Sequence, residues 1–236
     1  MPPPAAPANL AQWRTIMRAE LVARRQSVPP ELRRDWNLGI SLMLLHALPL
    51  RPGMVVGFCW PMRGEYDARP LMRLLRKQGV KNALPVITGR GQPLLYRHWE
   101  PGVPMKKGPL GIAYPDGTPQ LVPQVLLVPL VGFGGAGDRL GYGGGYFDRT
   151  LAALEPQPLA IGIGYELARM ETSFPQAHDV PMDAIVTETA MRWRSLGTLE
   201  EVNASGLRER LAELLQTRAD YARSMAHTVP QTNPIF

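Results

Sequence analysis

The stretch VLLVPLVGFGGAGDRLGYGGGYFDR, residues 125–149, decides the fold of this chain. Its opening segment is almost wholly apolar, which is typical of a strand covered on both faces. A glycine-rich loop follows, and after Gly145 the apolar residues Leu151 and Leu154 have helical spacing. A buried strand that leads through a glycine-rich loop into a helix is typical of a parallel α/β sheet. In such sheets ligands bind at the carboxyl ends of the strands.

Strands and helices are predicted to alternate along the rest of the chain. Short apolar segments predict strands at residues 54–60, 83–87, 93–99, 158–165 and 184–187. Apolar residues at spacings of three and four predict helices that include residues 13–21, 32–47, 71–75 and 207–221. This alternation predicts an α/β fold: a single-domain, three-layer, Rossmann-like sheet that is mostly parallel, with helices on both faces.

The two ends of the chain differ from this pattern. Residues 1–9 are mostly proline and alanine, so we expect a disordered tail there. Residues 10–200 are predicted to form the α/β domain, and residues 201–236 a C-terminal helix and a loose tail. The apolar face of that helix is expected to pack either on the domain or on a partner.

Composition limits the classes of partner. Of the 236 residues, 45% are hydrophobic and 19% are charged, which is typical of a globular protein. The net charge of +6 favours an anionic partner, but the basic residues are dispersed, so no nucleic-acid arm is expected. A single cysteine, Cys59, excludes an intrachain disulfide. The first residues are not a basic segment followed by an apolar one and no long apolar run occurs, so we expect no targeting segment. We therefore expect a cytoplasmic protein without membrane contact.

A dinucleotide fingerprint is matched only in part. Gly132, Gly134 and Gly137 give G-x-G-x-x-G directly after a predicted strand. That fingerprint needs a helix to begin within it, whereas residues 138–145 continue the loop with more glycine. An NAD or FAD site is therefore disfavoured, and no P-loop motif occurs in the sequence.

The longer loop suits a phosphate better. Its glycines allow several backbone N–H groups to converge on one anion, and they are Gly141, Gly143, Gly144 and Gly145. Arg139 adds a forked donor for phosphate oxygens, and Asp148 is placed to hold a Mg²⁺ ion that neutralises them. The alternative is a mobile glycine loop in which Asp148 is only an acidic residue at the start of a helix.

Two motifs indicate a family. With RLGYGGGYFDR at residues 139–149 and HDVPMDAIVTE at residues 178–188, the chain resembles the 5-formyltetrahydrofolate cyclo-ligase family, also called methenyltetrahydrofolate synthetase. The resemblance runs from about Arg14 to Glu188. It implies a ligase of folate one-carbon metabolism that uses ATP and Mg²⁺ to convert 5-formyltetrahydrofolate to 5,10-methenyltetrahydrofolate, with release of ADP and phosphate. Such an enzyme mainly positions its substrates and neutralises charge.

The resemblance also implies roles for particular residues. The predicted ATP-binding residues are Arg14, Arg18, Arg139, Gly141, Gly143, Gly144, Gly145 and Tyr146, and Arg14 stands where the family usually has lysine. The predicted folate-binding residues are Trp60, Glu65, Tyr142 and Tyr146. Arg139 and Tyr146 are the predicted catalytic residues, and Asp148 and Asp183 the predicted Mg²⁺ ligands. The alternatives are a solvated helix face for the N-terminal arginines, a core position for Trp60, and turn or capping positions for Glu65 and Asp183.

Two positions depart from the family pattern. Phe133-Gly134 stands where the family usually reads Phe-Asp, and Tyr114-Pro115 where it reads Glu-Pro. Asp138 or Glu166 is a candidate to restore a lost charge. A diverged member with another substrate or weak activity therefore stays open as an alternative, and so does a non-catalytic, basic nucleotide- or RNA-binding protein.

Overall fold

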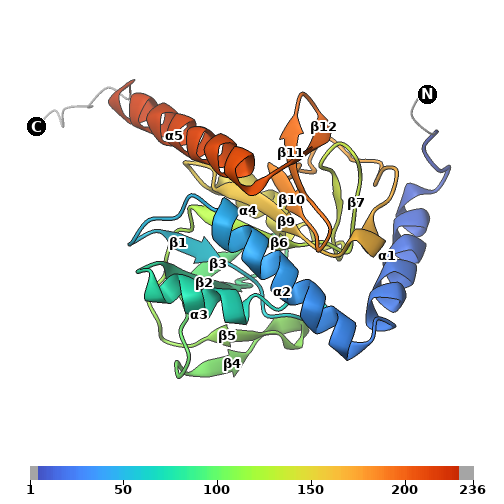
Figure 1. Cartoon of the computed structure of the whole chain (residues 1–236), viewed down its shortest axis with the longest axis horizontal. Helices are drawn as coiled ribbons and strands as arrows, with labels where there is room; N and C mark the ends of the chain where they lie inside the picture. The colour runs from blue at the N-terminus through green and yellow to red at the C-terminus, as the bar shows by residue number, and fades with distance from the viewer. Residues whose placement is uncertain (1–4, 229–236) are drawn as a thin grey trace, which may run out of the picture.

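The computed structural model describes residues 5–228, and their central feature is an eight-stranded sheet (Figure 1). Its strand order is β12-β11-β10-β9-β6-β1-β2-β3. The central strands from β10 to β2 are parallel, and the outer strands β3, β11 and β12 are antiparallel. Residues 1–4 and 229–236 of the predicted tails lie outside the described residues.

The parallel strands end at one edge of the sheet. They are β1 (Val55–Gly57), β2 (Lys81–Val86), β6 (Val125–Pro129), β9 (Leu159–Ile163) and β10 (Ala184–Val186). The antiparallel strands are β3 (Leu95–His98), β11 (Met191–Ser195) and β12 (Thr198–Val202). The prediction of a mostly parallel sheet is confirmed, and the segment around residues 93–99 reverses direction as an edge strand.

Helices cover both faces of this sheet. They are α1 (Leu10–Gln26), α2 (Pro30–Ala47), α3 (Arg69–Lys77), α4 (Tyr146–Ala153) and α5 (Ala204–Thr228), with short 3₁₀ turns η1 (Pro109–Gly111) and η2 (Glu166–Ala168). Leu127 of β6 packs in the core beneath α2, α3 and α5, whereas Leu126 and Val128 pack with Leu151 of α4. The alternation of β6 side chains between two cores explains why this strand is apolar throughout. None of the helices within residues 5–228 is long and apolar enough to cross a membrane.

Two small sheets were not predicted. β4 (Met105–Lys107) pairs with β5 (Ala113–Pro115), and β7 (Gly132–Phe133) pairs with β8 (Arg139–Leu140). These strands are too short to show a periodic pattern in the sequence. The β7–β8 hairpin contains the partial dinucleotide fingerprint, so those glycines form a turn between strands and do not lead into a helix.

Helix α1 lies beside the carboxyl edge of the sheet. Leu21 and Val22 pack against Val131 and Leu140, at the end of β6 and on β8. This contact orients the face of α1 that carries its buried arginine, Arg25, toward the loops that follow the parallel strands.

Candidate active site

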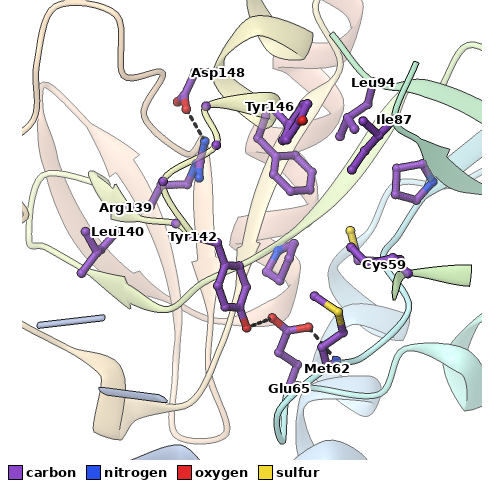
Figure 2. A pocket seen from close by; sticks show the side chains of 18 of the residues that line it. Cys59, Met62, Glu65, Ile87, Leu94, Arg139, Leu140, Tyr142, Tyr146 and Asp148 are labelled. Carbon is purple, nitrogen blue, oxygen red and sulfur yellow. Dashed lines mark hydrogen bonds and ion pairs between the residues drawn. The ribbon is translucent and has the colours of Figure 1, made fainter. Parts of the chain in front are cut away.

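A cavity of about 700 Å³ opens at the carboxyl edge of the sheet (Figure 2). Its walls come from α1, the loop after β1, the β4–β5 sheet and the glycine loop between β8 and α4. A volume of this size is typical of small-molecule sites. The position agrees with the expectation that ligands bind where parallel strands end.

The structure brings together every predicted site residue except Asp183. Those that line the cavity are Arg14, Arg18, Trp60, Glu65, Arg139, Gly141, Tyr142, Gly143, Gly144, Gly145, Tyr146 and Asp148. They come from three separate parts of the chain. The cavity therefore juxtaposes the residues predicted for ATP with those predicted for folate.

The glycine loop needs its glycines for two reasons. Gly143 and Gly145 have φ angles of +89° and +62°, a backbone conformation that residues other than glycine rarely adopt. A Cβ at Gly143 would also lie 3.2 Å from Cζ of Arg18. The loop backbone thus passes directly beneath a guanidinium group.

Arg139 and Asp148 face each other across the start of α4 (Figure 2). Arg139 Nη2 lies 2.8 Å from Asp148 Oδ2, and the two side chains are only 6% and 12% exposed. Nevertheless Nε and Nη2 of Arg139 have no aligned hydrogen-bond acceptor among the described residues. Asp148 Oδ1 accepts a hydrogen bond from the Val180 N–H. Arg139 therefore has hydrogen-bonding capacity that the described residues do not use, beside a carboxylate that balances its charge.

Two arginines of α1 reach the same region. Arg18 Nε donates to the Gly141 carbonyl at 2.7 Å, and no carboxylate within residues 5–228 forms an ion pair with it. Arg14 is held by the Asp179 carboxylate at 2.8 Å and by backbone carbonyls. Burial, and next the Arg14 charge, lower the pKa of Arg18. Both arginines line the cavity, which does not fit a merely solvated helix face.

Glu65 is a buried carboxylate in the opposite wall. Tyr142 donates its hydroxyl to Glu65 Oε1 at 2.7 Å, and the Met62 N–H donates to Oε2 at 2.9 Å (Figure 2). Burial raises the pKa of Glu65, although these hydrogen bonds and Arg25 oppose the rise. Burial and the neighbouring Glu65 raise the pKa of Tyr142 to about 12. Glu65 is therefore an oriented acceptor in the cavity, not a surface turn residue.

Trp60 belongs to both the cavity and the core. Its ring packs edge-on against Trp99, with centroids 6.0 Å apart. The Arg69 guanidinium lies 4.8 Å from the Trp60 centroid. These contacts fix the orientation of an indole that also lines the cavity.

Sequence reasoning missed Arg25, which joins three parts of the site. It is 4% exposed and donates to the Tyr142 hydroxyl at 2.7 Å, to the Leu130 carbonyl at 3.0 Å and to the Arg63 carbonyl at 3.1 Å. The signal was present, because Arg14, Arg18 and Arg25 follow each other at spacings that place them on one face of a helix. Asp179, which the sequence analysis did not single out, also lines the cavity as the partner of Arg14.

The structure does not place Asp183 beside Asp148. Asp183 directly precedes β10, at the amino end of the parallel strands, and does not line the cavity. Its carboxylate accepts hydrogen bonds from Arg218 and from the Ala160 N–H. The expectation that these two aspartates share a Mg²⁺ ion is therefore not supported by their positions.

The two departures from the family pattern have different outcomes. Tyr114 lines the cavity, where it presents a phenol in place of a carboxylate. Glu166 pairs with Arg192 at 2.8 Å and lies outside the cavity lining, so it does not replace a charge there. Asp138 lies directly beside Gly134.

Fold and cavity together define a class of protein, a Rossmann-like α/β protein with a ligand cavity at the carboxyl edge of its sheet. One side of the cavity is a loop rich in glycine and arginine, and the other carries Trp60 and the buried carboxylate of Glu65. A family profile described as the 5-formyltetrahydrofolate cyclo-ligase family matches residues 10–188. The chain belongs to this family and is an enzyme.

Individual relatives agree with this assignment. The 5-formyltetrahydrofolate cyclo-ligase of Escherichia coli K12 is 29% identical over 173 residues, which are 70% of this chain and 94% of the relative. That of Haemophilus influenzae is 27% identical over 178 residues, 72% of this chain and 95% of the relative. An NMR structure of Aquifex aeolicus 5,10-methenyltetrahydrofolate synthetase superimposes with a TM-score of 0.66 at 28% identity, covering 79% of this chain and 96% of that one. The family and these relatives indicate 5-formyltetrahydrofolate cyclo-ligase activity.

Proposed function

We propose that this enzyme uses ATP and Mg²⁺ to cyclise 5-formyltetrahydrofolate to 5,10-methenyltetrahydrofolate, releasing ADP and phosphate. One observation carries the proposal: a single cavity brings the glycine loop and its arginines against the wall formed by Trp60 and Glu65. A phosphate donor and a flat folate ring that forms hydrogen bonds can therefore meet in one cavity.

The triphosphate is assigned to the glycine-loop side. Backbone N–H groups of Gly143 to Gly145 and the guanidinium groups of Arg18 and Arg139 are the donors there. Arg139 has buried donors without aligned acceptors among the described residues, and Arg18 lacks an ion-pair partner among them. Forked, charged donors of this kind suit phosphate oxygens.

The residues present fit a Mg²⁺ ion only if the nucleotide supplies most of the ligands. No group of three His, Cys, Asp or Glu side chains in the described part of the chain could hold a metal ion. Mg²⁺ commonly binds through one or two carboxylates together with substrate phosphates. We assign Asp148 as the protein ligand, since it lines the cavity beside the glycine loop. The ion would neutralise phosphate charge.

The reduced folate is assigned to the opposite wall. Glu65 presents a fixed carboxylate that can accept hydrogen bonds from the pterin amino group and ring N–H. Trp60 offers an aromatic edge or face to the flat ring. Tyr142 in the glycine loop and Tyr146 at the start of α4 both line the cavity, and we assign them to both ligands.

The chemistry follows from this juxtaposition. The formyl oxygen attacks the γ-phosphorus and the bond to the ADP oxygen breaks. N10 then attacks the activated carbon and loses its proton to the phosphate or to solvent, and the C–O bond breaks to release phosphate. Arg139 and Tyr146 both line the cavity, and we assign them as the catalytic residues that contact the transferred group. Holding N10 against the activated carbon contributes on the order of 7–11 kcal/mol in an ideal geometry.

The test is the near-ultraviolet absorbance of the methenyl product. Wild-type protein with 5-formyltetrahydrofolate, Mg²⁺ and ATP should give a rise that requires ATP. Asp148→Asn should abolish it. Asp116→Asn should not, because Asp116 pairs with Lys106 and lies outside the cavity lining. A flat trace from folded wild-type protein that still binds Mg-ATP would exclude this reaction and direct attention to Tyr114 as the mark of another substrate.

A further inference from the structure

Gly134 and Asp138 close the turn of the β7–β8 hairpin. The Asp138 carboxylate lies directly beside the Cα atom of Gly134. The Gly134 N–H donates to the Asp138 carbonyl at 2.9 Å. A Cβ built on Gly134 would lie 2.3 Å and 2.5 Å from the two carboxylate oxygens of Asp138. The Asp138 carboxylate therefore occupies the space that a side chain at position 134 would take.

This carboxylate is buried. Asp138 is 4% exposed, and it forms no ion pair with any side chain that the structure describes. Its Oδ2 accepts a hydrogen bond from the Ser173 N–H at 2.6 Å, and Ser173 is fully buried. A buried carboxylate is costly unless it is hydrogen-bonded, so this contact fixes the backbone at Ser173 relative to the hairpin.

The same short segment holds Arg14. The Ser173 carbonyl accepts a hydrogen bond from Arg14 Nε at 3.2 Å, and the Phe174 carbonyl accepts one from Nη2 at 2.7 Å. Phe174 has a φ angle of +51°, an unusual conformation that the surrounding contacts must maintain. A continuous set of hydrogen bonds thus runs from Asp138 through Ser173 and Phe174 to Arg14, which lines the cavity.

We propose that Asp138 is a positioning residue for the nucleotide site, and that its carboxylate has been transposed by four positions along the chain. The family that the chain resembles usually has aspartate after Phe133, whereas this chain has Gly134, and the Asp138 carboxylate fills the space that a side chain at position 134 would take. Asp138 does not line the cavity and acts through Ser173 and Arg14. The inference rests on the proposed assignment of Arg14 to ATP.

The test exchanges the two positions. Asp138→Ala removes the carboxylate, Gly134→Asp adds a second one in the occupied space, and the double variant moves it back to position 134. The φ angle of Gly134 lies outside the left-handed range, so its backbone accepts a side chain. Dissociation constants for Mg-ATP are measured by calorimetry without folate, alongside KM for 5-formyltetrahydrofolate and unfolding in urea.

Each single change should weaken Mg-ATP binding about tenfold, and the double variant should recover to within about threefold of wild type. KM for folate should change less than twofold or so in all three, because Asp138 is linked to the Arg14 side of the cavity. Adding Asp138→Ala to Arg14→Ala should cause no further loss, since Asp138 acts through Arg14.

Two results would overturn the inference: full Mg-ATP affinity in a folded Asp138→Ala protein, or a double variant no better than the single changes. If the single variants do not fold, the double variant still decides, since a transposed carboxylate must restore both folding and binding. Wild-type protein that binds Mg-ATP but forms no methenyl product would refute the proposed reaction alone. Folded wild-type protein that does not bind Mg-ATP would refute both.

Discussion

Arg218 on α5 holds Asp183 with two parallel hydrogen bonds, Nη2 to Oδ1 at 2.8 Å and Nη1 to Oδ2 at 2.9 Å. Nη1 also donates to the Pro158 carbonyl, and Asp183 Oδ2 accepts from the Ala160 N–H. The pair thus fastens α5, which lies beyond the residues matched by the family profile, to the amino ends of β9 and β10.

Removing this clamp should destabilise the fold. The Arg218→Ala substitution leaves the Asp183 carboxylate, whose side chain is 12% exposed, without its cation. We expect the free energy of unfolding to fall by about 1–3 kcal/mol, measured in urea. Arg210→Ala is the matched control on the same helix: its ion pair with Glu200 is exposed, so the change should stay within about 0.5 kcal/mol.

Asp183→Asn separates the structural role from a metal role. We expect it to lower stability and to leave the Mg²⁺ concentration needed for half-maximal activity unchanged, because Asp183 does not line the cavity. A raised Mg²⁺ requirement in a variant of unchanged stability would instead support the original prediction that Asp183 is a ligand.

The glycine loop can be tested by a pair of substitutions with equal backbone strain. Gly143 and Gly53 have φ angles of +89° and +87°, but a Cβ at Gly53 meets nothing, whereas one at Gly143 meets Arg18. Each change to alanine should cost about 1–2 kcal/mol of stability. Only Gly143→Ala should also weaken Mg-ATP binding. Equal Mg-ATP affinity in the two variants would show that the loop backbone does not contact the nucleotide.

Arg18 should contribute to Mg-ATP affinity more than any exposed arginine of α1. Arg18→Ala removes a charged donor from the cavity and should weaken Mg-ATP binding by about 10- to 100-fold. Arg24→Ala is the control, since Arg24 is 58% exposed and pairs with Glu20 on the helix surface. Calorimetry with Mg-ATP measures both, and similar affinities in the two variants would remove Arg18 from the site.

Glu65 should make stability depend on pH. Burial raises its pKa above the ordinary 4.5, so between that value and the raised one the folded chain binds more protons at Glu65 than the unfolded chain. The stabilisation from this group is fully present below the ordinary pKa and is lost as pH rises through the folded pKa.

Glu65→Gln removes this titration. The difference in unfolding free energy, wild type minus variant, should therefore decrease as the pH rises above the ordinary pKa of 4.5. Urea unfolding at each pH measures this difference. A difference that increases with pH would mean that the hydrogen bonds from Tyr142 and Met62, together with Arg25, outweigh burial.

Local patterns accounted for much of the molecule. The continuous apolar run at residues 125–131 predicted a strand buried on both faces because each face of β6 packs into a separate core. The glycine loop was recognisable because residues 139–148 are contiguous. The glycines that its positive φ angles require and the charged residues at its two ends, Arg139 and Asp148, therefore stand together in the sequence. Short strands such as β7 and β8 were missed because two residues carry no periodicity.

The sequence by itself determined the fold class and the glycine loop, because backbone geometry imposes a spacing that apolar residues and glycines must follow. The other predicted residues of the cavity, such as Trp60 and Glu65, came from the family resemblance. Only the tertiary structure decided which charged groups meet. Arg14 and Ser173 are 159 positions apart, and Arg218 reaches Asp183 from a helix that the family motifs do not include. A side chain's partner depends on which distant segments the packed core brings together, and no local spacing encodes that choice. For this reason the sequence did not reveal that Asp183 binds Arg218 of α5. Nor did it reveal that the Asp138 carboxylate lies beside Gly134 in the folded chain.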